Sequence, residues 1–435
     1  MLMILTAAMS SVSCVYEYDM DGVKPDALKN VRLALNVRAL VNSPVNTGVK
    51  ETVNSLRVVM LNDQTVEAVI HLDQNDSEFT PSQAEEFSHL LTLTTLEGFK
   101  RFYIIANEES VGTINYQLSQ EEKEALGIEL PTDFSELLDS FSAGDDAETF
   151  ATVINSVYFA PSYQTDENKE INLPYTAYYD MLLTGVGGEK NVTFHLVPVA
   201  TKFYFQFTSY RTAPVNVNGI SLENVDTENF LMARVGTKDY YKYFGNDSYY
   251  WIDWLAKVSA ASWEHTDLDD NIKFNEDHGW IMDYSMPSAT KCEEYEFFDI
   301  QNKLVVPAAK VTEQEGDDGE TESIVTPTTV ISGPYYITES RNMEMPDPAN
   351  PNADPFQAYY LTMLLEDTAV GSEAPEFKHI AIGNLQALFR NTYVVIRIEM
   401  KQGDIEVYAQ INEWNKKSAN GWVNEGTKPN LLRRK

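Results

Sequence analysis

Residues 390–414 alternate strictly between apolar and polar side chains along two successive segments. The apolar positions are Val394, Ile396, Ile398 and Met400 in the first segment, and Ile405, Val407, Ala409 and Ile411 in the second. Gly403 and Asp404 stand between the segments, where glycine tolerates a positive φ and aspartate bonds to nearby backbone. A period of two is typical of strands with one buried face, so this region predicts a β-hairpin that packs on a core.

The same alternation occurs near the start of the chain. One face of residues 31–41 carries Val31, Leu33, Leu35, Val37, Ala39 and Val41. Further strands are predicted over residues 55–61, 66–72 and 102–108, the last a continuous apolar run that suits a strand buried on both faces. Short helices are predicted over residues 81–91, after the capping box at Ser119, and over residues 133–141. We therefore predict an all-β fold with a few short helices, and several short strands at turn-punctuated intervals favour β-sandwiches.

The length of 435 residues is enough for two or three domains. The glycine-rich residues 185–188 give the best boundary signal, since a fresh set of strands follows them. We expect one domain over residues 31–187 and a second over 188–414, with a C-terminal tail over 415–435. Residues 312–327 are acidic and poor in apolar side chains, which predicts an exposed loop.

The charge of the chain limits its partners. Acidic residues outnumber basic ones 66 to 32, which gives a net charge of −34. Such a chain is repelled by phosphate backbones and by anionic membrane surfaces, so nucleic acid is not expected as a partner.

Motifs that support catalysis or cofactor binding are absent from the sequence. There is no nucleophile elbow, P-loop, Rossmann glycine pattern, paired zinc cysteines or His-Glu-x-x-His. An acidic run lacks the order of a calcium-binding EF-hand loop: His265, Asp267, Asp269, Asp270 and His278. We therefore predict no enzyme activity, no cofactor and no metal site. The aromatic side chains of residues 240–254 suit a sandwich core better than a sugar-binding platform.

Cys14 follows a short apolar segment and the small residues 11–13. This arrangement is similar to a bacterial lipobox, in which the cysteine is acylated after cleavage of the signal, and it predicts lipidation at Cys14. Residues 1–14 are then the signal and residues 15–30 an acidic spacer. No Lys or Arg precedes the apolar run, so we expect the start of the signal to lie upstream of Met1. Cys292 has no metal or redox motif around it and is expected to be a lone thiol.

Several of these segments together resemble the Bacteroidales-type fimbrillins, the subunits of a surface pilus. The final hairpin carries Arg390-Asn391-Thr392-Tyr393 at its start and Trp414 at its end. Other similar patches are residues 53–58, 102–108, 199–205, 219–225 and 335–340, in the family's order over most of the chain. The resemblance implies two transthyretin-like β-sandwich domains in tandem, a cell-surface location with an outer-membrane lipid anchor, and polymerisation by β-strand exchange that supports adhesion.

The resemblance also implies a processing step. In the family, a trypsin-like protease cuts the loop behind the first strand, usually after arginine, and the matching position here is Lys50. This substitution raises two alternatives, an uncut anchor subunit or a protease that accepts lysine. The strand removed would be residues 31–41, and its place would be taken by a strand from a neighbouring copy or a related subunit. The tail 415–435 is the expected donor segment, with part of the final hairpin as the alternative.

Two questions remain open at this point. The first is the role of a fimbrial subunit, since the resemblance does not show whether the chain forms the stalk, the tip or the anchor. A surface lipoprotein that binds carbohydrate, on a host or a bacterial surface, is the alternative from a different class. A secreted hydrolase has no residue to support it.

Overall fold

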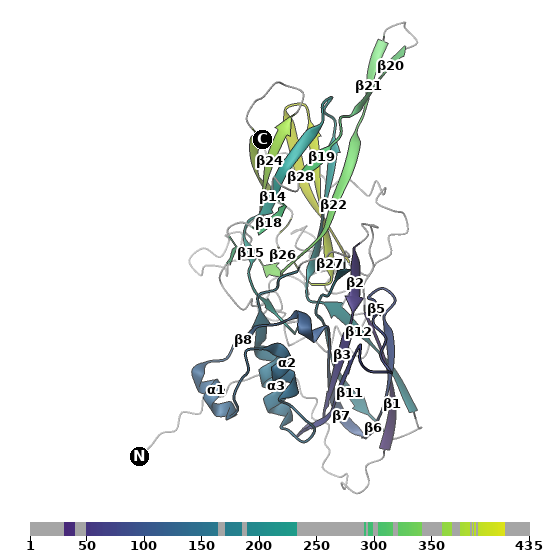
Figure 1. Cartoon of the computed structure of the whole chain (residues 1–435), viewed down its shortest axis with the longest axis vertical. Coiled ribbons are helices and arrows are strands. Elements are labelled where there is room, and N and C mark those ends of the chain that lie inside the picture. The colour runs from purple at the N-terminus through teal and green to yellow at the C-terminus, as the bar shows by residue number, and fades with distance from the viewer. Residues whose placement is uncertain are drawn as a thin grey trace, which may run out of the picture.

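The computed structural model describes residues 30–39, 49–163, 170–184, 189–232, 291–292, 295–298, 303–315, 321–341, 359–367, 375–382, 385, 387–388 and 390–413. These residues are mostly β-strand and form an elongated molecule with one domain below the other (Figure 1). The prediction of a mostly β fold with a few helices is confirmed. Among the described helices, none is long and apolar enough to cross a bilayer.

The first domain is built on a seven-stranded sheet with the order β4-β3-β7-β11-β12-β1-β6. Its strands are β1 (Asn30–Ala39), β3 (Ser55–Leu61), β4 (Val66–Asp73), β6 (Ser88–Leu96), β7 (Gly98–Ala106), β11 (Tyr175–Leu183) and β12 (Glu189–Pro198). The sheet curls around a core to which β1, β3, β7 and β12 all contribute, including Leu35, Phe102 and Phe194. Successive side chains of a strand point to opposite faces of the sheet, so alternate residues of each strand face this core.

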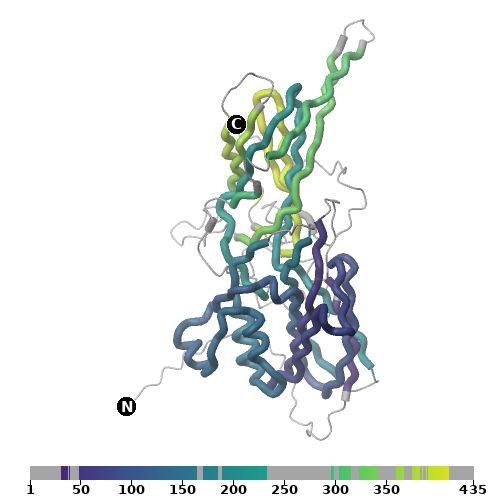
Figure 2. The backbone as a smooth tube through the Cα atoms, viewed as in Figure 1, coloured from purple at the N-terminus to yellow at the C-terminus, as the bar shows by residue number. Residues whose placement is uncertain are grey.

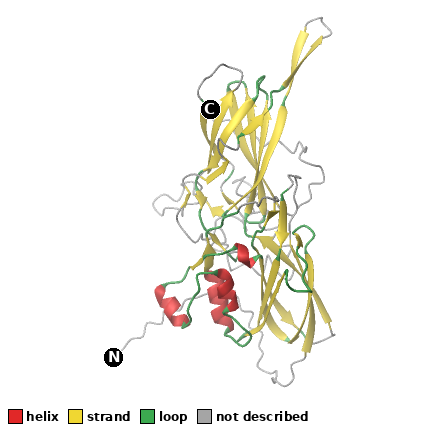
Figure 3. Ribbon diagram, in the orientation of Figure 1, coloured by secondary structure: helices red, strands yellow, loops and turns green. Residues whose placement is uncertain are grey.

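Three helices and a short 3-10 helix cover the outer face of this sheet (Figure 3). They are η2 (Glu108–Ser110), α1 (Gln120–Leu126), α2 (Phe134–Asp139) and α3 (Ala147–Ser156). Their apolar residues form a second core with the outward side chains of β3 and β7, among them Phe134, Phe150 and Tyr103. The predicted capping box at Ser119 is present, and the predicted helix over residues 133–141 is confirmed by α2. β7 is buried on both faces because it lies between the two cores, as its continuous apolar run indicates.

The second domain is a sandwich of two sheets. One has the order β22-β13-β27-β28, and the other has the order β18-β14-β24-β25 with β19 paired to β14. The strands are β13 (Thr201–Ser209), β14 (Val215–Leu222), β18 (Tyr295–Phe298), β19 (Leu304–Val306), β22 (Thr328–Ile337), β24 (Tyr359–Asp367), β25 (Glu376–Ile382), β27 (Thr392–Lys401) and β28 (Asp404–Glu413). The predicted hairpin is β27–β28, and its inward residues pack in the core between the sheets.

Short strands complete both domains and the region between them. They are β2 (Lys50–Val53), β5 (Ser82–Gln83), β8 (Ile114–Tyr116), β9 (Val157–Phe159), β10 (Glu170–Ile171), β15 (Val225–Asp226), β16 (Asn229–Phe230), β17 (Lys291–Cys292), β23 (Ser340–Arg341) and β26 (Ala387–Leu388). The hairpin β20 (Lys310–Glu315) and β21 (Thr321–Thr326) projects from the far end of the second domain (Figure 1).

Three predictions differ from this structure. The helix predicted over residues 81–91 is wrong, since Ser82 and Gln83 pair with β2 and the Thr-rich segment from Ser88 forms β6. The exposed loop predicted over 312–327 is largely strand, because its β-branched residues pair across a hairpin. β12 lies beyond the expected boundary at residue 187 yet belongs to the first sheet, so the chain passes to the second domain between β12 and β13.

Candidate functional site

β1 is the strand on which the predicted processing and assembly depend, and it lies inside the first sheet. It runs parallel to β12, from Arg32 opposite Glu189 to Ala39 opposite Leu196. On its other side it runs antiparallel to β6, from Asn30 opposite Leu96 to Arg38 opposite Ser88. Figure 2 shows this early segment beside β12, which is more than 150 residues later in the chain. β1 is thus held by two strands that are distant from it in sequence.

The inward side chains of β1 are buried in the core of the first domain, as the alternation predicts. Val31, Leu33, Leu35, Val37 and Ala39 are all buried, while the predicted sixth residue, Val41, lies outside the described residues. Burial of a valine or leucine side chain stabilises a fold by roughly 1.5–3 kcal/mol. The five positions together therefore contribute on the order of 10 kcal/mol. On the outer face Arg32 forms an ion pair with Glu189 at 3.3 Å.

Lys50, the predicted processing residue, begins β2 and is exposed. Its Nζ lies 3.3 Å from Oε1 of Glu170, which is its partner in the parallel pairing of β2 and β10. Residues 40–48, between β1 and this position, lie outside the described residues. Lys50 is therefore on the surface at the start of an ordered strand.

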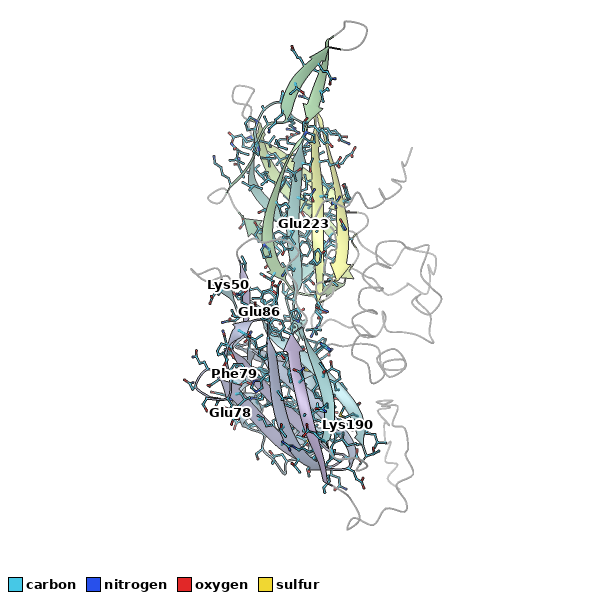
Figure 4. All side chains as sticks on the ribbon, turned by 90° about the vertical axis from the view of Figure 1, so that its right-hand side faces the viewer. Lys50, Glu78, Phe79, Glu86, Lys190 and Glu223 are labelled. Carbon is cyan, nitrogen blue, oxygen red and sulfur yellow. The ribbon has the colours of Figure 1, made fainter. Side chains whose placement is uncertain are left out.

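The residue after Lys50 is fixed at the junction of the two domains. The backbone carbonyl of Glu51 accepts a hydrogen bond of 2.7 Å from Ala84 N, and its carboxylate forms a buried ion pair with Lys202 of β13. Oε1 of Glu51 also accepts a bond of 2.7 Å from the Tyr336 hydroxyl in β22. Burial lowers the pKa of Lys202, and the charge of Glu51 opposes that effect. β2 is thus held by the second domain as well as by its own sheet. Figure 4 shows Lys50 and Glu86 at this level of the molecule.

A second buried ion pair lies at the same junction and involves the motif that starts β27. Arg390 is 1% exposed and binds Oε2 of Glu339 through Nε at 2.8 Å and through Nη2 at 2.6 Å. It also donates to the backbone oxygens of Phe230 and Leu231, at 2.6 and 2.8 Å. Asn391 takes a left-handed conformation, with φ of 59°, and its N donates to Ala200 O. Arg390 therefore supplies hydrogen bonds, from inside the protein, to a buried carboxylate and to backbone oxygens at the junction of the two domains.

Glu67 of β4 joins the two end strands of the seven-stranded sheet. Its Oε2 accepts a hydrogen bond of 2.7 Å from Oγ1 of Thr95 in β6. Its Oε1 accepts bonds from Nζ of Lys100 at 2.6 Å and from Nδ2 of Asn62 at 2.9 Å. Burial acts to raise the pKa of Glu67, but the bonds from Lys100, Asn62 and Thr95 outweigh it and hold the pKa below the usual 4.5. The curled sheet is closed by this contact.

The lowered pKa of Glu67 predicts that acid loosens β6. A carboxylate whose pKa is lower in the folded state contributes stability above its unfolded pKa, and that contribution is lost as the pH falls through the folded pKa. Hydrogen exchange of residues 88–96, corrected for intrinsic rates, should therefore increase below about pH 4.5. The increase should be smaller in Glu67→Gln, and an equal increase in both proteins would contradict this role of Glu67.

The other sequence-predicted residues are distributed as follows. Cys14 and the tail 415–435 lie outside the described residues, as do the aromatic residues 240–254 and the acidic run from His265 to His278. Within the described part of the chain, no group of three or more His, Cys, Asp or Glu residues could hold a metal ion. Glu51, Lys202 and Glu67 were not predicted. The sequence signal for such buried pairs is a lysine or glutamate within a predicted strand, and the sequence does not show which lysine pairs with which glutamate.

Comparison with known proteins gives structural matches over nearly the whole chain. No family model matches the sequence, and no curated protein matches it. The tip fimbrial protein Mfa3 of Porphyromonas gingivalis, with a C-terminal truncation, is similar at 11% identity and a TM-score of 0.41, covering 88% of this chain and 100% of that one.

Two further matches have similar values. The fimbrilin of Porphyromonas gingivalis is 9% identical with a TM-score of 0.39, covering 89% of this chain and 98% of that one. A fimbrial assembly protein of Parabacteroides distasonis is 9% identical with a TM-score of 0.37, again covering 89% and 98%. These structures are Bacteroidales fimbrial proteins, the class to which the sequence resemblance pointed.

Proposed function

We propose that this chain is a structural subunit of a cell-surface fimbria that is exported as an outer-membrane lipoprotein and polymerises by strand exchange. The observation that carries the proposal is the position of β1. It is an inner strand of the sheet, with five buried apolar residues, and it precedes the exposed Lys50. A cut at Lys50 would separate this strand from the rest of the first domain. Each domain would be a transthyretin-like sandwich.

Removal of β1 would leave a gap between β12 and β6, which we call the β1 groove. Its walls would be the backbone groups of two strands that had lost their partner, and its floor the apolar core of the first domain. Unpaired strand edges recruit a further strand, through main-chain hydrogen bonds and through pockets for alternate side chains. The groove suits a segment with small or medium apolar residues at alternate positions, as in β1 itself.

The expected occupant is a strand from another copy of this chain or from a related subunit. The tail 415–435 follows β28 and is the proposed donor, although Gly426 and Pro429 interrupt its alternation. Part of the final hairpin is the alternative donor. Host or bacterial surface ligands would then be bound by the assembled fimbria.

Cleavage at Lys50 also distinguishes the two possible roles of the chain, a polymerising subunit and an anchor. It is the only basic residue between Ala39 and Glu51. Mass spectrometry of protein shed from the cell surface should find an N-terminus at Glu51 if the chain is processed there. An N-terminus found only at Cys14 would assign the chain to the anchor position instead.

Deletion of residues 415–435 tests the donor assignment. We expect the shortened chain to fold, because the deleted segment follows the last strand of the second sandwich, and to form no filaments. Electron microscopy of the wild-type and shortened proteins at equal concentration gives the result, and circular dichroism gives the control for folding. Filaments of normal length from the shortened chain would show that the donor lies elsewhere.

Lipidation at Cys14 has its own test. Metabolic labelling with a fatty-acid analogue should tag the wild-type protein and leave Cys14→Ser untagged. Acyl chains on one cysteine give stable membrane attachment when two or more are present, since each buried methylene contributes about 0.8 kcal/mol. Equal labelling of the two proteins, or of neither, would refute this assignment.

A further inference from the structure

We infer that the hydrogen bond from Thr95 to Glu67 keeps β6 in place as a wall of the β1 groove after β1 has left. Thr95 is thus a positioning residue for strand capture. This inference rests on the proposed function, because it concerns the state in which β1 is absent. It is carried by contacts of the described residues that do not involve β1.

β6 is the strand that depends most on β1. Among the described residues, its only strand partner is β1, and β6 forms the end of the sheet. Leu91 and Leu93 are only partly buried against the core, and Leu90, on the opposite face, is 64% exposed. Once β1 leaves, β6 has no backbone partner and little apolar burial. A segment with few buried contacts opens at low free-energy cost.

The Thr95–Glu67 bond crosses to a part of the sheet that β1 does not touch. Glu67 is held by Lys100 of β7 and by Asn62, as described above, so Thr95 donates to an acceptor that is already fixed. Thr95 is buried, and so is Lys100. β4 pairs with β3, and β7 pairs with β3 and β11, so neither strand needs β1 for its backbone pairing. The end of β6 that lies at Thr95 is therefore anchored independently of β1.

The other end of β6 is anchored by aromatic rings. The ring of His89 lies 5.6 Å from that of Phe79, which lies 6.1 Å from the ring of Phe87. Phe79 is labelled in Figure 4, on the same side of the domain as Lys50. With both ends fixed, the backbone of β6 stays extended, and the groove keeps the width of one strand. A donor strand then binds to a β6 that is already extended, so less conformational entropy of β6 is lost on binding.

The test uses the full chain with a site-specific protease sequence inserted after Val45, so that β1 can be cut from the rest of the protein. A fluorescent peptide of residues 30–41, added in excess, replaces the resident strand, and its affinity and dissociation rate are measured. The variant is Thr95→Val, which removes the donor and keeps the side-chain shape. The matched control is Thr94→Val, since Thr94 is the adjacent residue of the same type and is exposed.

We expect Thr95→Val to bind the peptide about tenfold more weakly than the wild type, because a hydrogen bond to a charged acceptor is lost. Thr94→Val should bind like the wild type. Hydrogen exchange gives the second readout. Residues 88–96 should exchange faster in cut, peptide-free Thr95→Val than in the cut wild type. The difference between the two should be larger in the cut proteins than in the uncut proteins, where β1 also holds β6, and this separates the effect from a general loss of folding.

Equal peptide affinity and equal exchange of β6 in the wild type and Thr95→Val would overturn the inference. The outcome is separable from that of the proposed function. If Thr95→Val binds the peptide about tenfold more weakly than the cut wild type, but the chain never forms filaments, the role of Thr95 stands and polymerisation by strand exchange is refuted. If filaments form and Thr95→Val changes neither the peptide affinity nor the exchange of β6, polymerisation stands and the role of Thr95 is refuted.

Discussion

The double variant Asn36→Cys/Leu90→Cys should form no filaments when oxidised and should form them again after reduction. Asn36 of β1 and Leu90 of β6 are directly opposite each other in the antiparallel pairing, and Leu90 is on the exposed face. Directly opposed residues have Cα atoms about 4.5–5.5 Å apart, within the range that a disulfide spans. The disulfide would hold β1 in the sheet even after a cut at Lys50, so the groove would stay filled.

The disulfide should abolish filament formation completely and not merely reduce it. Polymerisation by strand exchange requires β1 to leave every subunit but the last. Electron microscopy of oxidised and reduced samples, in a Cys292→Ser background, measures the result. Each single cysteine variant is the control, since neither can form the bond to its neighbour. Filaments of normal length from the fully oxidised double variant would show that β1 stays in place during assembly.

The second large effect is expected at the domain junction. Arg390→Met should lower the free energy of unfolding by roughly 3–5 kcal/mol, because it leaves the carboxylate of Glu339 buried without its partner. The backbone oxygens of Phe230 and Leu231 lose a donor at the same time. Urea unfolding followed by fluorescence gives the value.

Arg397→Met is the matched control for Arg390→Met. Arg397 lies in β27, seven residues after Arg390, is only half-buried, and donates to Gln410 Oε1 at 2.7 Å. Its loss should cost about 1 kcal/mol. Losses of equal size in the two variants would contradict the view that Arg390 holds the domains together.

The strands of this fold could largely be predicted from side-chain alternation. β1 and the hairpin β27–β28 appear where a period of two was seen, because each has one face in a core, and β3 and β4 appear over the segments predicted as strands. Local rules failed over residues 81–91. There, a capping-box pattern and a proline suggested a helix, but Gln83 pairs with Thr52 of β2, so a tertiary contact decided the backbone. α3 was not predicted, although Asp146 is an N-cap and Phe150, Ala151 and Ile154 have helical spacing.

The contacts that define the candidate site could not be predicted in the same way. Thr95 and Glu67 are in different strands, and nothing in either segment indicates that the sheet curls to bring them together. Glu51 meets Lys202 and Tyr336 only because the two domains pack end to end. Such pairs depend on the fold as a whole, whereas a strand of alternating residues can be seen within ten positions.

The domain junction also bears on assembly. The ion pair of Glu51 with Lys202 joins β2, the strand that begins at Lys50, to the second domain. A cut at Lys50 would therefore free the preceding segment while the chain from Glu51 onward stayed fixed. This is the arrangement that a subunit needs if it is to lose one strand and keep its shape.

The most direct test of the account is an electron cryomicroscopy structure of the assembled filament, with the chain traced between β12 and β6. We expect the density in that position to connect to a neighbouring copy, with apolar side chains at alternate positions over the core of the first domain. Residues 30–39 of the same copy in that position would contradict polymerisation by strand exchange through the β1 groove.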